Sequence, residues 1–210
     1  MSGSLRVDRV VTSGTFSLDG GTWEVDNNVW VVGDDDECVV IDAAHDAGPI
    51  LDTVAGRTVV GILLTHAHDD HIGAAEQLRE ATGAPTYLHL DDRMLWDRVH
   101  TGEPDRKLDH GDRIAVADTQ VHVLHTPGHA PGACSFYVPE LGRVFTGDTL
   151  FQGGPGATGR SFSDFPTIID SIAEKLLSLP SETVVHPGHG ADTTIGAEAA
   201  DLSTWLARGH

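Results

Sequence analysis

The 210-residue sequence has few basic residues and no long apolar run. It holds 13 Lys and Arg against 32 Asp and Glu, which gives a formal net charge of −19 at pH 7. Such a charge repels phosphate backbones and anionic membrane surfaces at long range, so we expect no nucleic-acid partner. No apolar run approaches the roughly 20 residues that cross a bilayer, and the first residues lack a basic stretch followed by an apolar one. We therefore expect neither a membrane partner nor a secretory signal.

Cysteine is also scarce. Cys38 and Cys134 are the only two, and each lies alone in an apolar, strand-like context. Isolated cysteines are more consistent with buried thiols in a reducing compartment than with a disulfide framework, so we expect a cytoplasmic protein. Histidine, in contrast, is abundant at 13 residues. It is the commonest side-chain metal ligand and titrates near neutral pH, which directs the search for function to these residues.

The order of apolar runs predicts a layered α/β fold. No segment is repetitive or Ser/Gly-rich for long enough to be a linker, so we expect one domain over residues 1–210. Continuous apolar strands between amphipathic helices indicate sheets that are covered on both faces. Strands are expected at 5–12, 22–25, 29–32, 38–41, 59–64, 121–124, 134–138, 143–146 and 183–185, and helices at 72–81, 91–100, 168–177 and 197–207. The segment Asp26-Asn27-Asn28 is expected to turn, and Asp91-Asp92 to be a solvated turn.

A cluster of metal-ligating side chains lies between an expected strand and an expected helix. The segment 65–71, Thr-His-Ala-His-Asp-Asp-His, places His66, His68, Asp70 and His71 within six residues. In a strand-to-helix loop, the irregular backbone can turn several of these side chains toward one point. The alternative is a helix N-terminus that is capped by one of its aspartates and carries solvated histidines. Three clustered histidines fit that alternative poorly, and we therefore predict a metal site.

Three later strands end on a histidine or an aspartate. Pro-Gly precedes both His129 and His189, and Gly147 precedes Asp148. Open α/β sheets place their ligand sites at the C-terminal ends of strands, so we expect these residues to join the first cluster. Five histidines and two aspartates exceed the three protein ligands of one catalytic zinc, which indicates two metals that share a ligand. The set contains nitrogen and oxygen but no thiolate, which suits zinc, iron or manganese.

Together these residues resemble the metal signature of the metallo-β-lactamase-fold hydrolases, over residues 29–190. The resemblance implies a four-layer αββα sandwich with the metal site at one edge of its two sheets. It also implies a first metal held by His66, His68 and His129. A second metal would be held by Asp70, His71 and His189, and Asp148 would bridge the two metals.

Within that superfamily the sequence is most similar to short type II glyoxalases, which hydrolyse thioesters. The similarity rests on Thr126-Pro-Gly-His-Ala-Pro-Gly132, Phe145-Thr-Gly-Asp-Thr-Leu-Phe151 and Pro187-Gly-His-Gly190. It implies a small-thiol thioester hydrolase with two divalent ions, expected to be zinc, with iron or manganese as alternatives. A hydroxide that bridges the metals would attack the carbonyl, and Asp70 would be the catalytic residue that orients it. The C-terminal region that binds glutathione in two-domain members is not expected here, so glutathione, mycothiol and other thiols stay open.

Other activities of the same scaffold are alternatives. A mononuclear non-haem iron persulfide dioxygenase resembles this chain at His66, His129 and Asp148, and metal analysis with oxygen uptake would separate it from the hydrolase. Hydrolysis of a lactone or another ester is a second alternative, and a non-catalytic metal-binding protein is a third. A β-lactamase is less favoured, because Asp148 stands where the best-known secreted enzymes place cysteine.

The substrate is expected to be a small molecule, most simply an anionic thioester. The glycine-rich segment 151–165 follows Asp148 directly, which indicates a mobile wall of the site. Arg160 within it is the candidate substrate-binding residue, for a carboxylate, with a plain surface arginine as an equal alternative. Trp96 is expected in the core. The oligomeric state is left open. The remaining histidines are expected to be structural or solvated, with two candidates for support of the metal ligands, His125 and His186.

Overall fold

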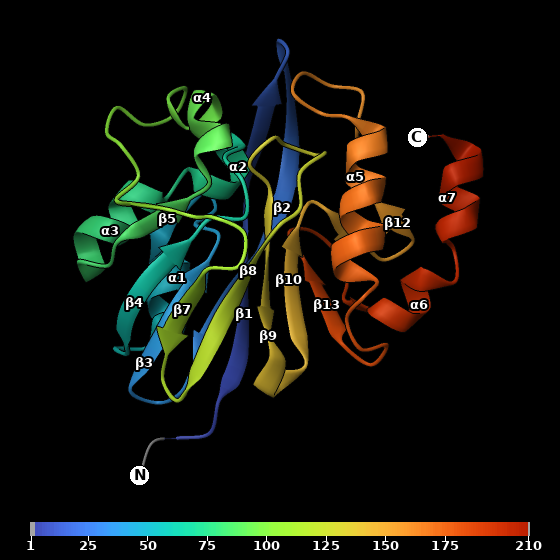
Figure 1. The fold of residues 1–210 in the computed structure, drawn as a ribbon. Helices are drawn as coiled ribbons and strands as arrows, with labels where there is room; N and C mark the ends of the chain where they lie inside the picture. The colour runs from blue at the N-terminus through green and yellow to red at the C-terminus, as the bar shows by residue number, and fades with distance from the viewer. Residues whose placement is uncertain (1–2, 210) are drawn as a thin grey trace.

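Two six-stranded β-sheets face each other, with helices on their outer sides (Figure 1). The structure is a computed structural model that describes residues 3–209. The first sheet has the order β1-β2-β3-β4-β5-β6 and the second β14-β13-β10-β9-β8-β7. The first contains β1 (Arg6–Leu18), β2 (Gly21–Gly33), β3 (Glu37–Ile41), β4 (Thr58–Leu63), β5 (Thr86–Leu88) and β6 (Arg106–Lys107). The second contains β7 (Arg113–Val116), β8 (Thr119–His125), β9 (Cys134–Val138), β10 (Arg143–Gly147), β13 (Val184–Pro187) and β14 (Thr193–Thr194).

Helices and one small strand pair complete the fold. The pair is β11 (Leu150–Phe151) and β12 (Gly154–Pro155). The helices are α1 (Ala47–Val54), α2 (Asp69–Ile72), α3 (Ala75–Thr82), α4 (Arg93–Trp96), α5 (Phe165–Ser171), α6 (Ile195–Ala199) and α7 (Leu202–Arg208). Among residues 3–209, no helix combines the length and the apolar character that crossing a membrane requires.

The layers follow from the two-residue period of side chains along a strand. In β2, Val29 and Val31 pack beneath the helices of the first sheet, whereas Trp30 faces the second sheet. In β10, Val144 packs against the C-terminal helices, and Phe145 faces the first sheet. The central strands of each sheet are therefore buried on both faces, which is why strands such as β3 are continuous apolar runs in the sequence. The expected four-layer αββα sandwich is confirmed.

Helix α5 shows how local sequence sets an outer layer. Its N-cap is Asp164, whose carboxylate accepts a hydrogen bond from the Thr167 backbone N–H at 2.9 Å, and Pro166 occupies the first turn. The helix buries Ile168 against the second sheet and continues as a π-helical turn over Ile172–Leu176. The helix expected at 168–177 is thus present, with its start fixed by the cap.

The two cysteines and Trp96 have the environments expected for them. Cys38 and Cys134 are buried free thiols, and burial raises the pKa of Cys38 to about 11. Trp96 is 2% exposed, and its indole N–H donates a hydrogen bond to the Gly102 carbonyl at 2.7 Å. These side chains therefore serve the core.

The prediction of a turn at Asp26-Asn27-Asn28 is wrong. Strand β2 runs through all three residues and pairs with β1 along its whole length. Asn27 and Asn28 are buried, because their side-chain amides donate hydrogen bonds to Asp70 Oδ2 and to the Pro187 carbonyl. These polar residues mark interior contacts of the strand.

Three expected helices are also shorter than predicted. The helix over 91–100 is reduced to α4, which follows a 3₁₀ turn over Leu90–Asp92. The helix over 72–81 is interrupted between α2 and α3, because the Ala74 backbone N–H bonds to the Ala43 carbonyl instead of continuing the helix. The helix over 197–207 is divided into α6 and α7.

The ends of β4, β8, β10 and β13 define one edge of the sandwich. β10 and β13 are parallel, and β8 runs in the same direction because β9 is antiparallel to both β8 and β10. The β1–β2 hairpin rises beyond this edge, with its tip between α4 and the loop before α5 (Figure 1). Its tip is Asp19-Gly20, both with positive φ, 53° and 78°, as a two-residue Asp-Gly hairpin turn requires. The fold therefore gathers the loops after four strands beside a projecting hairpin.

Candidate metal centre

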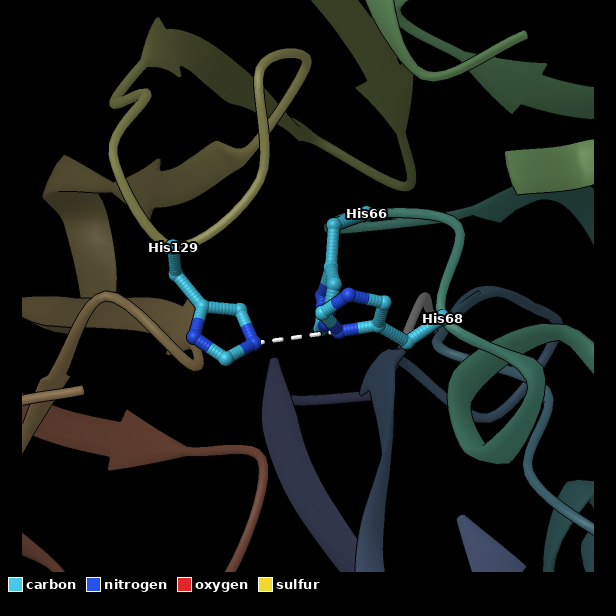
Figure 2. A group of neighbouring side chains, drawn as sticks. All are labelled: His66, His68 and His129. Atoms are coloured by element: carbon cyan, nitrogen blue, oxygen red, sulfur yellow. Dashed lines mark hydrogen bonds between the residues drawn. The ribbon is translucent and has the colours of Figure 1, made fainter. Parts of the chain in front are cut away.

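Three imidazole nitrogens meet where the loop after β4 faces the loop after β8. His66 and His68 lie in the first loop and His129 in the second (Figure 2). His68 Nδ1 is 3.0 Å from His66 Nε2 and 3.1 Å from His129 Nε2. Three nitrogens this close can hold one zinc-like ion and leave a fourth position open.

A second group lies beside the first. Asp70 and His71 belong to α2, and His189 follows β13. His71 Nε2 is 3.3 Å from His189 Nε2, and Asp70 Oδ2 is 3.5 Å and 3.3 Å from these two nitrogens. Two nitrogens and one carboxylate oxygen therefore converge on a second position.

Asp148, which follows β10, lies between the two groups. Its Oδ1 is 3.4 Å from His71 Nε2, while its Oδ2 is 3.6 Å from His129 Nε2 and 3.4 Å from His189 Nε2. One carboxylate that reaches both groups has the geometry of a shared ligand. Gly147 permits this approach, because its φ is +49° and a Cβ there would lie 2.4 Å from Thr65 Oγ1. The structure thus brings together all seven side chains that the sequence singled out.

Hydrogen bonds on the outer side of the histidines fix which nitrogen faces the centre. His129 Nδ1 donates to the Ala157 carbonyl at 2.8 Å, and His189 Nδ1 donates to the Asp26 carbonyl at 2.7 Å. A carbonyl can only accept, so the proton is on Nδ1 in each ring. Nε2 of each ring therefore faces the centre and can bind a cation once it is unprotonated, which is how metal-binding histidines are usually held.

Asp42 fixes the histidines that follow β4 in the same way, and it was not predicted from the sequence. Its Oδ2 accepts hydrogen bonds from His71 Nδ1 at 2.8 Å and from Thr65 Oγ1 at 2.9 Å, and its Oδ1 accepts from the Thr65 backbone N–H. The Thr65 hydroxyl in turn lies 3.1 Å from His66 Nδ1. Asp42 directly follows β3, so the signal that identified Asp148, an acidic side chain at a strand end, was present here too.

Asp92 connects the loop after β4 with the loop after β8. The prediction that it lies in a solvated turn is wrong. It is 0% exposed, and its carboxylate accepts hydrogen bonds from the backbone N–H groups of Ala67 at 3.0 Å and Gly132 at 2.6 Å. Burial raises its pKa to about 6. Because Ala67 lies between His66 and His68 and Gly132 follows His129, this carboxylate sets the spacing of the first group.

The two groups differ in charge. Burial lowers the pKa of His66 well below its usual value and that of His68 to about 3, so both rings are neutral. Burial would also lower the pKa of His189, but Asp148 and Asp70 raise it to about 10. The second group therefore retains positive charge in the form of protons, and divalent cations that displaced those protons would supply it instead.

Two buried carboxylate oxygens test whether metal ions fit. Asp70 Oδ1 and Asp148 Oδ1 are buried and have no hydrogen-bond partner among the described residues. Buried polar atoms rarely lack a partner unless an ion or a ligand supplies one. With five imidazoles they form a nitrogen and oxygen donor set without thiolate, which zinc, iron and manganese accept. The residues present therefore fit two divalent metal ions.

Asn27 positions Asp70 from the neighbouring strand. Its side-chain N–H donates to Asp70 Oδ2 at 3.0 Å, and its Oδ1 accepts from His45 Nε2 at 2.8 Å. We expect Asn27→Ala to weaken binding of the second metal about 10- to 100-fold, the usual cost of removing such a supporting group. Competition with a metallochromic chelator measures this, with the exposed Ser13→Ala as a control on the same hairpin. Unchanged affinity for both ions would refute the role of Asn27.

The side chain of Arg160 packs against two aromatic rings of the β1–β2 hairpin. Its guanidinium is 3.9 Å from the ring centre of Trp23 and 5.7 Å from that of Phe16, and the Phe16 ring is 5.1 Å from that of His68. The next residue, Ser161, donates its backbone N–H to Asp19 at 3.0 Å. The glycine-rich segment therefore rests against the hairpin and borders the metal centre.

The two candidate supporting histidines occupy other environments. His125 Nε2 donates to the Pro131 carbonyl at 2.9 Å, and its ring stacks on that of His89 at 4.0 Å. His186 lies against Trp30, with ring centres 4.4 Å apart. His125 thus braces the loop that carries His129, while His186 packs in the sheet.

Comparison with known proteins agrees with this geometry. The profile of the "Metallo-beta-lactamase superfamily" matches residues 22–189. "Probable metallo-hydrolase YqgX" of Bacillus subtilis is 37% identical over 186 residues, which cover 81% of this chain and 88% of that protein. "Hydroxyacylglutathione hydrolase GloC" of Haemophilus influenzae is 33% identical over 188 residues, 81% of this chain and 89% of that protein.

A solved structure extends the comparison. The crystal structure of TTHA1623 in a di-iron-bound form has 38% sequence identity and a TM-score of 0.75, and the match covers 83% of this chain and 93% of that one. The family profile spans most of the chain, including all seven residues of the metal centre. The chain therefore belongs to the metallo-beta-lactamase superfamily.

Proposed function

We propose that this protein is a dinuclear, zinc-dependent hydrolase of thioesters formed by a small thiol. The observation that carries the proposal is the pair of complete ligand groups joined by Asp148. Two divalent ions held there would lower the pKa of a shared water and polarise a carbonyl oxygen. Similarity to a hydroxyacylglutathione hydrolase favours a thioester over other esters.

Asp70 is the proposed catalytic residue because its two oxygens differ. Oδ2 accepts the hydrogen bond of Asn27 and faces His71 and His189, whereas Oδ1 is buried without a partner. Oδ2 would thus hold the metal, and Oδ1 would accept a hydrogen bond from the attacking water and orient it. Burial would raise the pKa of Asp70, but His71 and His189 lower it to about 2, which keeps this acceptor ionised.

The charge of the centre favours an anionic substrate. Two divalent ions exceed the charge of Asp70 and Asp148, so this edge would be locally positive although the chain carries −19. A thiolate leaving group also needs little help from an acid, because the pKa of a thiol is only about 8.5. A small anionic thioester therefore matches both the field and the chemistry of the centre.

Metal analysis combined with a substrate panel tests the proposal. We expect purified protein to contain about two zinc ions per chain and to hydrolyse lactoyl thioesters of glutathione or mycothiol at least about 100-fold faster than a lactone or an oxygen ester. A chelator-treated sample is the control. Faster turnover of the lactone or the oxygen ester would instead support the general ester hydrolase.

A mononuclear iron persulfide dioxygenase is the second candidate. The observation in its favour concerns the metal alone: TTHA1623, which is similar to this chain, binds iron, although as two ions. The same samples, supplied with glutathione persulfide in air, separate the two candidates with an oxygen electrode. Oxygen consumption by iron-containing protein that leaves thioesters intact would overturn the hydrolase proposal.

A further inference from the structure

A cavity of about 210 Å³ opens beside the first metal group, between the hairpin and α4. Its lining is formed by the hairpin, the loop that carries His68, and the α4 region: Ser17, Leu18, Ala67, His68, Asp69, Leu95, Arg98 and Val99. The metal group and the cavity thus share one imidazole ring. The cavity therefore adjoins the place where a reacting carbonyl would lie, and a short chain attached to that carbonyl could extend past the edge of the ring into it.

The size of the cavity limits what it can hold. Pockets for drug-sized ligands measure about 300–1,000 Å³. A cavity of 210 Å³ therefore fits a fragment, such as the acyl half of a thioester, and not a peptide thiol. The larger thiol half would lie outside it.

The lining of the cavity combines apolar side chains with one acidic and one basic group. The Asp69 carboxylate already accepts a hydrogen bond from the Ser17 backbone N–H at 3.1 Å, whereas Arg98 lies at the rim. Leu18 and Leu95 are buried, while Val99 is 37% exposed. Arg98 is exposed, and its guanidinium lies 5.2 Å from the ring centre of Phe162. No carboxylate forms an ion pair with Arg98 in the part of the chain that the structure describes. The Asp19 carboxylate at the hairpin tip attracts this charge without forming an ion pair with it, so the guanidinium N–H groups can still bind an anionic group at the rim.

A second feature of the wall points to a ligand. His68 is 4% exposed, and its Nδ1 faces the other two imidazoles of the metal group. Its Nε2, on the other side of the ring, has no hydrogen-bond partner among the described residues. Metal-binding histidines usually donate this outer N–H to an acceptor. A polar atom of a cavity ligand could supply that acceptor after a small shift of the ring.

We propose that this cavity binds the acyl half of the substrate, a short apolar chain that ends in a carboxylate at Arg98. The inference rests on the proposed thioester hydrolysis and names its substrate class: thioesters of four-carbon dicarboxylic acids, with succinyl as the probe. The apolar carbons contact Leu18, Leu95 and Val99, and the carboxylate replaces the solvent around the guanidinium. Phe162, on the segment that rests on the hairpin, lies 5.2 Å from the Arg98 guanidinium and so borders the outer end.

Three thioesters of one thiol, with acetyl, butyryl and succinyl groups, test the inference. We expect Arg98→Gln to raise KM about tenfold for the succinyl thioester and less than twofold for the butyryl one, because only the former meets the guanidinium. Val99→Trp, which fills the rim, should raise KM for both four-carbon chains but not for acetyl. Arg113→Gln, an exposed arginine on β7, is the matched control.

A binding measurement separates failure of this inference from failure of the proposed function. Isothermal titration of the metal-loaded protein should show succinate binding that Arg98→Gln weakens about tenfold and Arg113→Gln leaves unchanged. If no thioester is hydrolysed but this pattern holds, the hydrolase proposal fails and the anion site stands. If thioesters are hydrolysed but both variants change KM equally for all three acyl groups, or not at all, the cavity does not bind the acyl chain.

Discussion

Asp70→Asn should lower kcat for thioester hydrolysis about 10³-fold, within the range expected when a group that orients or deprotonates the nucleophile is lost. The substitution keeps the volume of the side chain, and the amide oxygen can still accept the hydrogen bond of Asn27. It removes the negative charge beside His71 and His189, so the second metal should also bind more weakly. Stopped-flow kinetics at saturating zinc separates the two effects, because excess metal restores occupancy but not kcat.

The fold should survive this change. We expect the metal-loaded variant to melt within about 4 °C of the parent, the shift that roughly 1 kcal/mol produces in a chain of this size. Asp52→Asn, at an exposed carboxylate on α1, is the control for loss of one negative charge. Near-normal kcat in Asp70→Asn would remove Asp70 from the catalytic role, and a collapse of the melting temperature would make it a structural residue.

The layers of the fold were predictable because each is a local pattern that repeats. Strands such as β3 and β10 are buried on both faces, so their apolar runs report their position in the sandwich without knowledge of their partners. The seven metal-centre residues were predictable for a related reason. Each lies in the loop, or in the first turn of the helix, that follows a strand, and such segments gather at one edge of the fold.

The errors concern polar residues whose partners are distant in the sequence. Asn27 bonds to a residue 43 positions away, and Asp92 bonds to backbone groups 25 and 40 positions away. Their local sequences are those of solvated turns, and only the tertiary fold supplies the donors and acceptors that bury them. Asp42 was missed although its position at a strand end matches that of Asp148, because it lacks the preceding glycine that drew attention to Asp148.

Removal of the metals should abolish hydrolysis and lower stability together. Ions that bind only the folded chain stabilise it by about 4 kcal/mol at 1,000 times the dissociation constant, which corresponds to roughly 8–16 °C in melting temperature here. Differential scanning calorimetry of metal-loaded and chelator-stripped protein measures this shift. Readdition of zinc to the stripped protein should restore both activity and melting temperature, and it serves as the control for damage by the chelator.

The difference in melting temperature between metal-loaded and metal-free protein should increase with pH. In the metal-free protein, Asp148 and Asp70 overcome burial and raise the pKa of His189 to about 10, against 6.5 in the unfolded chain. This contribution to stability is complete below pH 6.5 and disappears as the pH rises toward 10. In the loaded protein the same nitrogen must be unprotonated to bind, so rising pH strengthens binding. The difference in melting temperature between the two forms should therefore grow from pH 6.5 to 9, and a constant difference would show that protons and metals do not compete at His189.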